Sequence, residues 1–164
     1  MQGVILFAHG SLLCGAGQSL LKHAQRLRAM EVAPIVEVGY LNYSEPPFVQ
    51  AVERCREQGA THITVTPYFL APGKFVTVDL PKAVEEAQRL FPALSFTIAP
   101  AIGFDERLAD ALITAAEEAR TAEFWGAAEA EATAFCRASA ECPLFATPAC
   151  PKGIKTFEEV TTNV

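Results

Sequence analysis

The sequence predicts an α/β fold in which a four-stranded parallel sheet lies between helices on both faces. Short apolar runs alternate with amphipathic segments along residues 1–121. This alternation of strand and helix is typical of parallel sheets with right-handed crossovers. Of the 164 residues, 51% are hydrophobic, which is enough to bury one sizeable core.

The expected strands and helices form eight alternating segments. The strands cover residues 3–9, 35–41, 62–70 and 95–102, and the helices cover residues 17–31, 47–58, 79–91 and 106–121. In the first helix, the apolar residues share one face at helical spacing. They are Leu20, Leu21, Ala24 and Leu27.

Turn and cap residues support the predicted helix ends. Pro46-Pro47 opens the second helix and Gly59 ends it. Asp79 and Asp105 stand at the starts of the third and fourth helices, where a carboxylate accepts hydrogen bonds from free backbone N–H groups. Residues 1–121 therefore form the predicted domain, and residues 122–164 a helical, Cys- and Pro-containing C-terminal extension.

Charge and hydropathy argue against two classes of protein. The net charge is −6 and the Lys and Arg residues are scattered, whereas a nucleic-acid-binding protein carries clustered basic residues. The apolar runs are far shorter than the ~18 residues that a membrane-spanning helix needs. Because no secretory signal precedes the first strand, we expect a cytoplasmic protein.

His9 is the main candidate for chemistry. It follows the apolar run of the first strand and precedes Gly10 and Ser11. The carboxyl ends of parallel strands share one edge, where open α/β sheets bind their ligands. Histidine is the commonest protein metal ligand and carries protons near neutral pH. His23 lies within a predicted helix and is expected to be a surface or packing residue, whereas His62, at the opposite edge, is expected to be structural.

Polar and aromatic residues follow the other strands at the same edge. They include Asn42, Tyr43, Glu45, Lys74 and Phe75. Together with His9 and Ser11 they suit a flat, apolar ligand with polar edges. The alternative is that the aromatic residues belong to the core.

Three of the five cysteines cluster near the end of the sequence. They are Cys136, Cys142 and Cys150, and the last two are each followed by proline. Cys-Pro recurs at iron–sulfur ligands. The spacing fits no standard motif, and a fourth ligand would have to come from Cys14 or a partner subunit. An iron–sulfur cluster and a set of ordinary thiols therefore both remain open.

Three segments in order resemble the small class II chelatases, the cobaltochelatases and sirohydrochlorin chelatases. The resemblance covers roughly residues 3–120. The segments are Phe7-Ala8-His9-Gly10-Ser11, Gly39-Tyr40-Leu41-Asn42-Tyr43-Ser44-Glu45-Pro46, and the run from Pro67 to Pro81 that contains Gly73-Lys74-Phe75-Val76.

The resemblance implies a chelatase-like three-layer sandwich and a homodimer. It also implies a lyase that inserts a divalent metal, Co²⁺ or Fe²⁺, into a sirohydrochlorin-type tetrapyrrole during cobalamin or sirohaem biosynthesis. His9 would bind the metal or accept a proton, with Glu45 as a weaker helper. The residues expected to bind substrate are Ser11, Asn42, Tyr43, Lys74 and Phe75.

Two positions depart from the family pattern. Phe75 stands where a second histidine is usual, and Asn42 stands where a glutamate is often found. Neither can act as a base at neutral pH. Three interpretations follow: a variant chelatase that depends on His9, a tetrapyrrole- or metal-binding protein without catalysis, and an iron–sulfur protein on a chelatase scaffold.

Overall fold

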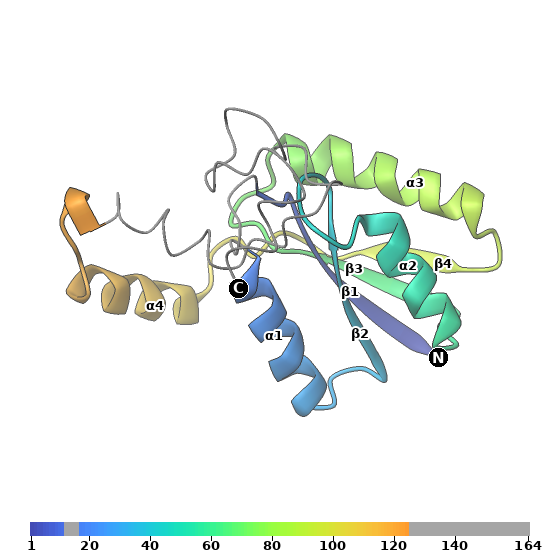
Figure 1. The fold of residues 1–164 in the computed structure, drawn as a ribbon, viewed down its shortest axis with the longest axis horizontal. Coiled ribbons are helices and arrows are strands. Elements are labelled where there is room, and N and C mark those ends of the chain that lie inside the picture. The colour runs from blue at the N-terminus through green and yellow to red at the C-terminus, as the bar shows by residue number, and fades with distance from the viewer. Residues whose placement is uncertain (12–16, 125–164) are drawn as a thin grey trace, which may run out of the picture.

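The computed structural model describes residues 1–11 and 17–124 and confirms the alternation of strands and helices (Figure 1). The elements in order are β1 (Gln2–Ala8), α1 (Gln18–Ala29), β2 (Ile35–Tyr40), α2 (Phe48–Glu57), β3 (His62–Pro67), the π-helical turn η1 (Phe75–Asp79), α3 (Leu80–Leu90), β4 (Ser95–Ile98) and α4 (Glu106–Glu117). None of these helices is long and apolar enough to cross a membrane.

The four strands form one parallel sheet in the order β2-β1-β3-β4. The chain leaves β1 towards β2 on one side and later adds β3 on the other side of β1. The strand order therefore reverses at the carboxyl end of β1, which is where open α/β sheets bind ligands. His9 directly follows β1 at this point.

Helices cover both faces of the sheet, as predicted. α2 and α3 bury the larger core, in which Phe7 and Ile63 are fully buried, and α1 covers the other face of β1 and β2 (Figure 1). Leu20 and Ala24 are the buried residues of α1, so the apolar face expected from its spacing is the one that packs.

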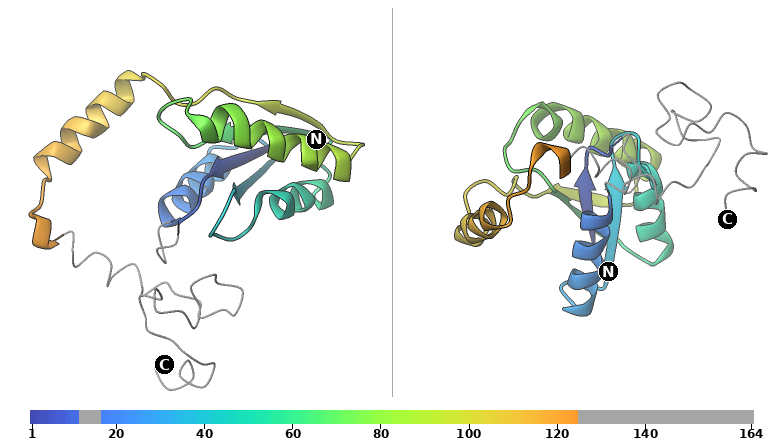
Figure 2. Two further views of the ribbon diagram at one scale, coloured as in Figure 1. Left: turned by 90° about the horizontal axis from the view of Figure 1, so that it is seen from above. Right: turned by 60° about the vertical axis from the view of Figure 1, so that its left-hand side comes forward.

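α4 projects away from the sheet in Figures 1 and 2, and none of its residues is buried. The half-sheet that α1 leaves uncovered, over β3 and β4, carries polar side chains. His62 bonds to the hydroxyls of Ser95 at 2.9 Å and Thr97 at 3.1 Å, and the Thr64 hydroxyl bonds to that of Thr97 at 3.1 Å. His62 thus has the structural role expected of it.

Several boundaries differ from the prediction. β3 and β4 end at Pro67 and Ile98, so they are shorter than the apolar runs that continue into the loops. Asp79 is not an N-cap: its backbone is helical, and η1 extends the helical path back to Phe75. Asp105, in contrast, accepts a hydrogen bond from the Arg107 N–H at 2.9 Å and caps α4 as predicted.

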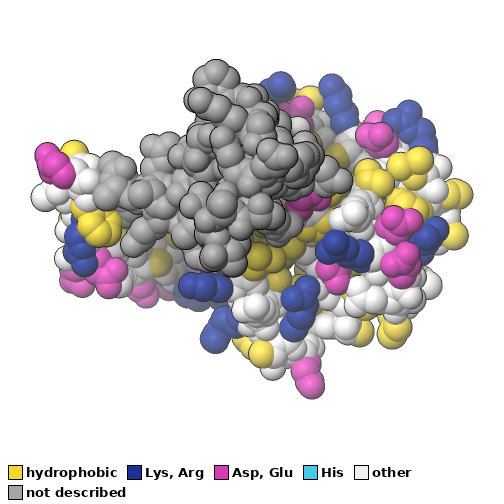
Figure 3. Space-filling view, in the orientation of Figure 1, with side chains coloured by type: hydrophobic (Ala, Val, Ile, Leu, Met, Phe, Trp, Pro, Cys, Tyr) yellow, Lys and Arg dark blue, Asp and Glu magenta, His cyan; other side chains and the backbone are white. Residues whose placement is uncertain are grey.

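Charges of both signs are mixed on the face drawn in Figure 3, where Lys and Arg side chains lie among Asp and Glu side chains. This matches the scattered basic residues of the sequence.

Candidate active site at the carboxyl edge of the sheet

The turn after β1 is held by the loop that follows β2. The Asn42 N–H donates to the His9 carbonyl at 2.9 Å, and the Leu41 N–H donates to that of Ala8 at 2.9 Å. Gly10 has a φ of +89°, and a Cβ at this position would overlap the carbonyl oxygen of Asn42. Only glycine therefore allows this close approach.

A serine completes the connection between the two loops. The Ser44 hydroxyl accepts a hydrogen bond from the Ser11 N–H at 3.1 Å, across 33 residues of sequence. Ser11 was expected in the site, whereas no role was predicted for Ser44. Its position in a polar loop after a strand was the available clue, since serine hydroxyls commonly bond nearby backbone groups in turns.

The His9 imidazole has a defined orientation. Its Nδ1 lies 3.2 Å from the Gly10 carbonyl oxygen. Because a carbonyl oxygen only accepts, Nδ1 carries the proton in this contact and Nε2 presents its lone pair when the ring is neutral. His9 can therefore offer Nε2 to a metal ion or a proton.

Aromatic rings flank this imidazole. The Phe75 ring lies 4.3 Å from the His9 ring, centroid to centroid, and the Tyr43 ring lies 5.8 Å away in an edge-on arrangement. Phe69 stacks behind Phe75 at 6.0 Å and continues to Phe7 in the core at 6.3 Å. Phe75 and Tyr43 remain 38% and 53% exposed, so both present ring surface to a ligand.

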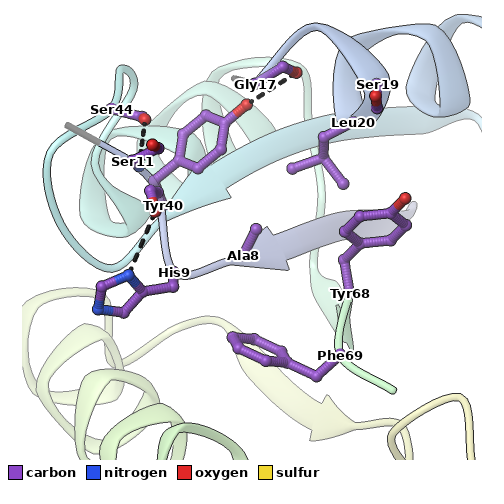
Figure 4. A pocket seen from close by; sticks show the side chains of 11 residues that line it. Ala8, His9, Ser11, Gly17, Ser19, Leu20, Tyr40, Ser44, Tyr68 and Phe69 are labelled. Atoms are coloured by element: carbon purple, nitrogen blue, oxygen red, sulfur yellow. Dashed lines mark hydrogen bonds between the residues drawn. The ribbon is translucent and has the colours of Figure 1, made fainter. Parts of the chain in front are cut away.

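A pocket of about 180 Å³ opens beside His9 on the α1 side of the sheet (Figure 4). Most of its lining surface is apolar, and serine and tyrosine residues place hydroxyl groups along it. The lining residues are Ala8, His9, Gly10, Ser11, Gly17, Ser19, Leu20, Tyr40, Ser44, Tyr68 and Phe69.

The other predicted site residues have exposed side chains in the loops at this edge. Asn42 and Glu45 are exposed side chains of the β2–α2 loop, and Lys74 is exposed directly before η1. Within residues 1–11 and 17–124, no three His, Cys, Asp or Glu side chains gather as a metal site. The structure thus brings together His9, Ser11, Tyr43 and Phe75, and His9 supplies the imidazole of this group.

The cysteine cluster cannot be placed in this geometry. Cys14, Cys136, Cys142 and Cys150 lie outside the described residues. Among the described residues the free cysteine is Cys55, a buried residue of α2 that lies near Gly3, at the opposite end of β1 from His9.

Known proteins share both the sequence and the fold. A sirohydrochlorin cobaltochelatase of Methanocaldococcus jannaschii is 42% identical over 82 residues, which are 50% of this chain and 57% of that protein. One from Sulfolobus acidocaldarius is 32% identical over 123 residues, 75% of this chain and 96% of that protein. The chain thus spans little more than half the length of the first of these relatives.

A solved structure agrees with this likeness. The sirohydrochlorin chelatase SirB from Bacillus subtilis subspecies spizizenii, in complex with cobalt, superposes with a TM-score of 0.67 at 28% identity, covering 71% of this chain and 50% of that one. The family model for CbiX matches residues 3–119, which run from the second residue of β1 to beyond the end of α4. The resemblance expected from the three motifs is therefore confirmed: the chain belongs to the CbiX family.

Proposed function

We propose that the protein inserts Co²⁺ or Fe²⁺ into a sirohydrochlorin-type tetrapyrrole, as a step of cobalamin or sirohaem biosynthesis. The observation that carries this proposal is His9, whose Nδ1 is bonded to Gly10 and whose Nε2 is left for chemistry beside exposed aromatic rings. The cobaltochelatase and ferrochelatase names of the relatives support the same reaction. A cytoplasmic location is part of this proposal.

The reaction exchanges two protons for one metal ion. Two pyrrole N–H bonds break, the two protons leave, and the metal forms bonds to the pyrrole nitrogens. The Nε2 atom of His9 either holds the incoming metal or accepts one of these protons, because a single lone pair serves one partner at a time.

The neighbouring residues suit a flat macrocycle with acidic side arms. Phe75 and Tyr43 offer ring faces against which an apolar macrocycle packs. We assign Lys74, Ser11 and Asn42 to polar groups at the edge of the substrate, and Glu45 to assistance with the metal or a proton. These assignments rest on location at the same edge of the sheet.

We also propose that two copies of the chain form a homodimer through α4. Leu112 and Ile113 of this amphipathic helix are each 59% exposed. The half-sheet over β3 and β4, which α1 does not cover, is polar, as the His62 and Thr97 contacts show, so it does not match this apolar surface. A second copy would bury the apolar face of α4 and release water from it.

A second candidate function is binding of the tetrapyrrole without catalysis. Phe75 favours this alternative, because a phenyl ring occupies the place beside His9 where relatives of this kind are expected to carry a second imidazole. The iron–sulfur interpretation is not part of the proposal, since its cysteines lie outside the described residues and the relatives are named for metal insertion.

An anaerobic insertion assay separates the two functions. Purified protein is mixed with sirohydrochlorin and Co²⁺ or Fe²⁺, and the absorption change of the metallated product is followed. We expect turnover by the unaltered protein, none above the spontaneous rate with His9→Ala, and normal turnover with the control His62→Ala. Tight binding of sirohydrochlorin without turnover by the unaltered protein would overturn the proposed reaction in favour of a binding function.

A further inference from the structure

A second histidine reaches the pocket from the helix side. His23 lies on α1, and its Nε2 is 3.4 Å from the hydroxyl oxygen of Tyr68, the residue that directly follows β3. The two rings are 5.4 Å apart between centroids. Tyr68 lines the same pocket as His9 and is 42% exposed, and His23 is exposed to solvent as well. The pair therefore connects the pocket with bulk water.

Both partners stand on firmly held backbone. The Tyr68 N–H donates to the Phe7 carbonyl at 2.7 Å, which joins Tyr68 to the end of β1. Leu20, one turn before His23 on α1, is buried and also lines the pocket. Figure 4 shows the Tyr68 ring near Leu20 and apart from the His9 ring. Proton transfer through Tyr68 would thus leave His9 free for the metal.

The reaction needs a second proton acceptor, and Glu45, exposed on the β2–α2 loop, is not among the residues that line the pocket. Two protons leave the macrocycle, and Nδ1 of His9 is already bonded to Gly10. Phe75, which contacts His9, has no group that accepts a proton. A base contributes when it lies within hydrogen-bond reach of the proton, directly or through one water molecule.

We propose that Tyr68 and His23 form the proton exit of the site. This proposal rests on the proposed metal insertion. A pyrrole proton passes to the Tyr68 oxygen, directly or through water, while the Tyr68 hydroxyl proton passes to Nε2 of His23. Tyrosine ends unchanged, and the histidine, now an imidazolium, releases the proton to solvent.

Few other charges surround His23 in the described part of the chain. Lys22 and Arg26 are its charged neighbours on α1, and Tyr68 faces it from the end of β3. The residues of β1 and β2 that face α1 are uncharged. They are Val4, Leu6, Ala8, Val36, Val38 and Tyr40. Of these side chains, the neutral imidazole of His23 is the one with a nitrogen lone pair that can accept a proton.

The test compares four variants of the full chain with the unaltered protein. They are His23→Gln, Tyr68→Phe, the double variant, and the matched control His62→Gln on the polar half-sheet. Initial rates of Co²⁺ insertion into sirohydrochlorin are measured between about pH 5 and 8, where imidazoles titrate. Thermal unfolding checks that each variant is folded. We expect the site variants to fold, because both substitutions replace exposed side chains.

We expect kcat to fall roughly tenfold in either single variant, with the KM for sirohydrochlorin unchanged. This is less than the roughly 10²–10⁴-fold usual for a general base, because water can take the place of an exposed side chain. The double variant should lose no more than either single variant, because the two residues act as one unit. Added imidazole should restore the kcat of the His23→Gln variant. The decrease in kcat as the pH is lowered should differ between this variant and the unaltered protein. The control His62→Gln should match the unaltered protein.

The possible failures are distinct. If the unaltered protein shows no insertion, the proposed function fails, and the proton exit fails with it. If insertion occurs and depends on His9, but His23→Gln matches His62→Gln in rate and pH profile, only the proton exit is overturned. An equal loss of rate in His62→Gln would also overturn it, because the effect would not be specific to the pocket.

Discussion

Replacing Gly10 by alanine tests whether the turn after β1 holds the candidate site together. At a φ of +89° an alanine is in a backbone region that costs an L-residue about 1–2 kcal/mol. Its Cβ would also overlap the Asn42 carbonyl oxygen and lie 3.3 Å from the Ser44 nitrogen. The β2–α2 loop therefore has to move away from the end of β1.

This movement breaks two hydrogen bonds. They join the Asn42 N–H to the His9 carbonyl at 2.9 Å and the Ser11 N–H to the Ser44 hydroxyl at 3.1 Å. Each contributes about 1 kcal/mol. Together with the backbone term, we expect Gly10→Ala to lower the free energy of unfolding by about 3–4 kcal/mol. For a chain of this size the midpoint of thermal unfolding should fall by roughly 10 °C.

Gly73→Ala is the matched control, because a Cβ at Gly73 meets no atom within 4 Å. Thermal and urea unfolding of both variants, followed by circular dichroism, measure the difference directly. Metal insertion should also fall sharply in Gly10→Ala, since His9 loses its backbone support. If Gly10→Ala unfolds within about 0.5 kcal/mol of the control, the turn does not have the role assigned to it.

Three further predictions concern single residues. Phe75→His places a second imidazole beside His9, so Co²⁺ affinity measured by calorimetry should rise about tenfold or more, ~1.4 kcal/mol; unchanged affinity would contradict the assigned geometry. Burial raises the pKa of the Cys55 thiol to about 12, from an ordinary 9.0, so alkylation of this thiol in the folded protein should be slow. The thiol of the unfolded chain ionises at lower pH than that of the folded protein. The free energy of unfolding should therefore fall as the pH rises from 9 towards 12. Hydrogen bonds from Arg107 lower the pKa of Asp105 to about 2, from 3.8. The stabilisation of α4 by this carboxylate should therefore be present above about pH 4 and lost towards pH 2. The Asp105→Asn variant should not show this loss.

Local patterns account for the parts of the fold that were predicted correctly. The face of α1 that packs is visible in the spacing of Leu20 and Ala24, and the N-cap of α4 is visible in Asp105. The prediction that Asp79 is an N-cap was wrong, because η1 extends the helix back to Phe75. No residue type marks a π-helical turn in the sequence.

The alternation of strands and helices and the place of His9 at the carboxyl edge could be predicted from the sequence, because both depend on residues close together in the chain. Which groups meet at that edge could not be predicted, because it depends on contacts between distant segments. Ser11 reaches Ser44 across 33 residues, and Tyr68 reaches His23 across 45. Contacts of this kind depend on strand order and helix packing, which bring distant loops to one edge, and periodicity within one segment does not record them.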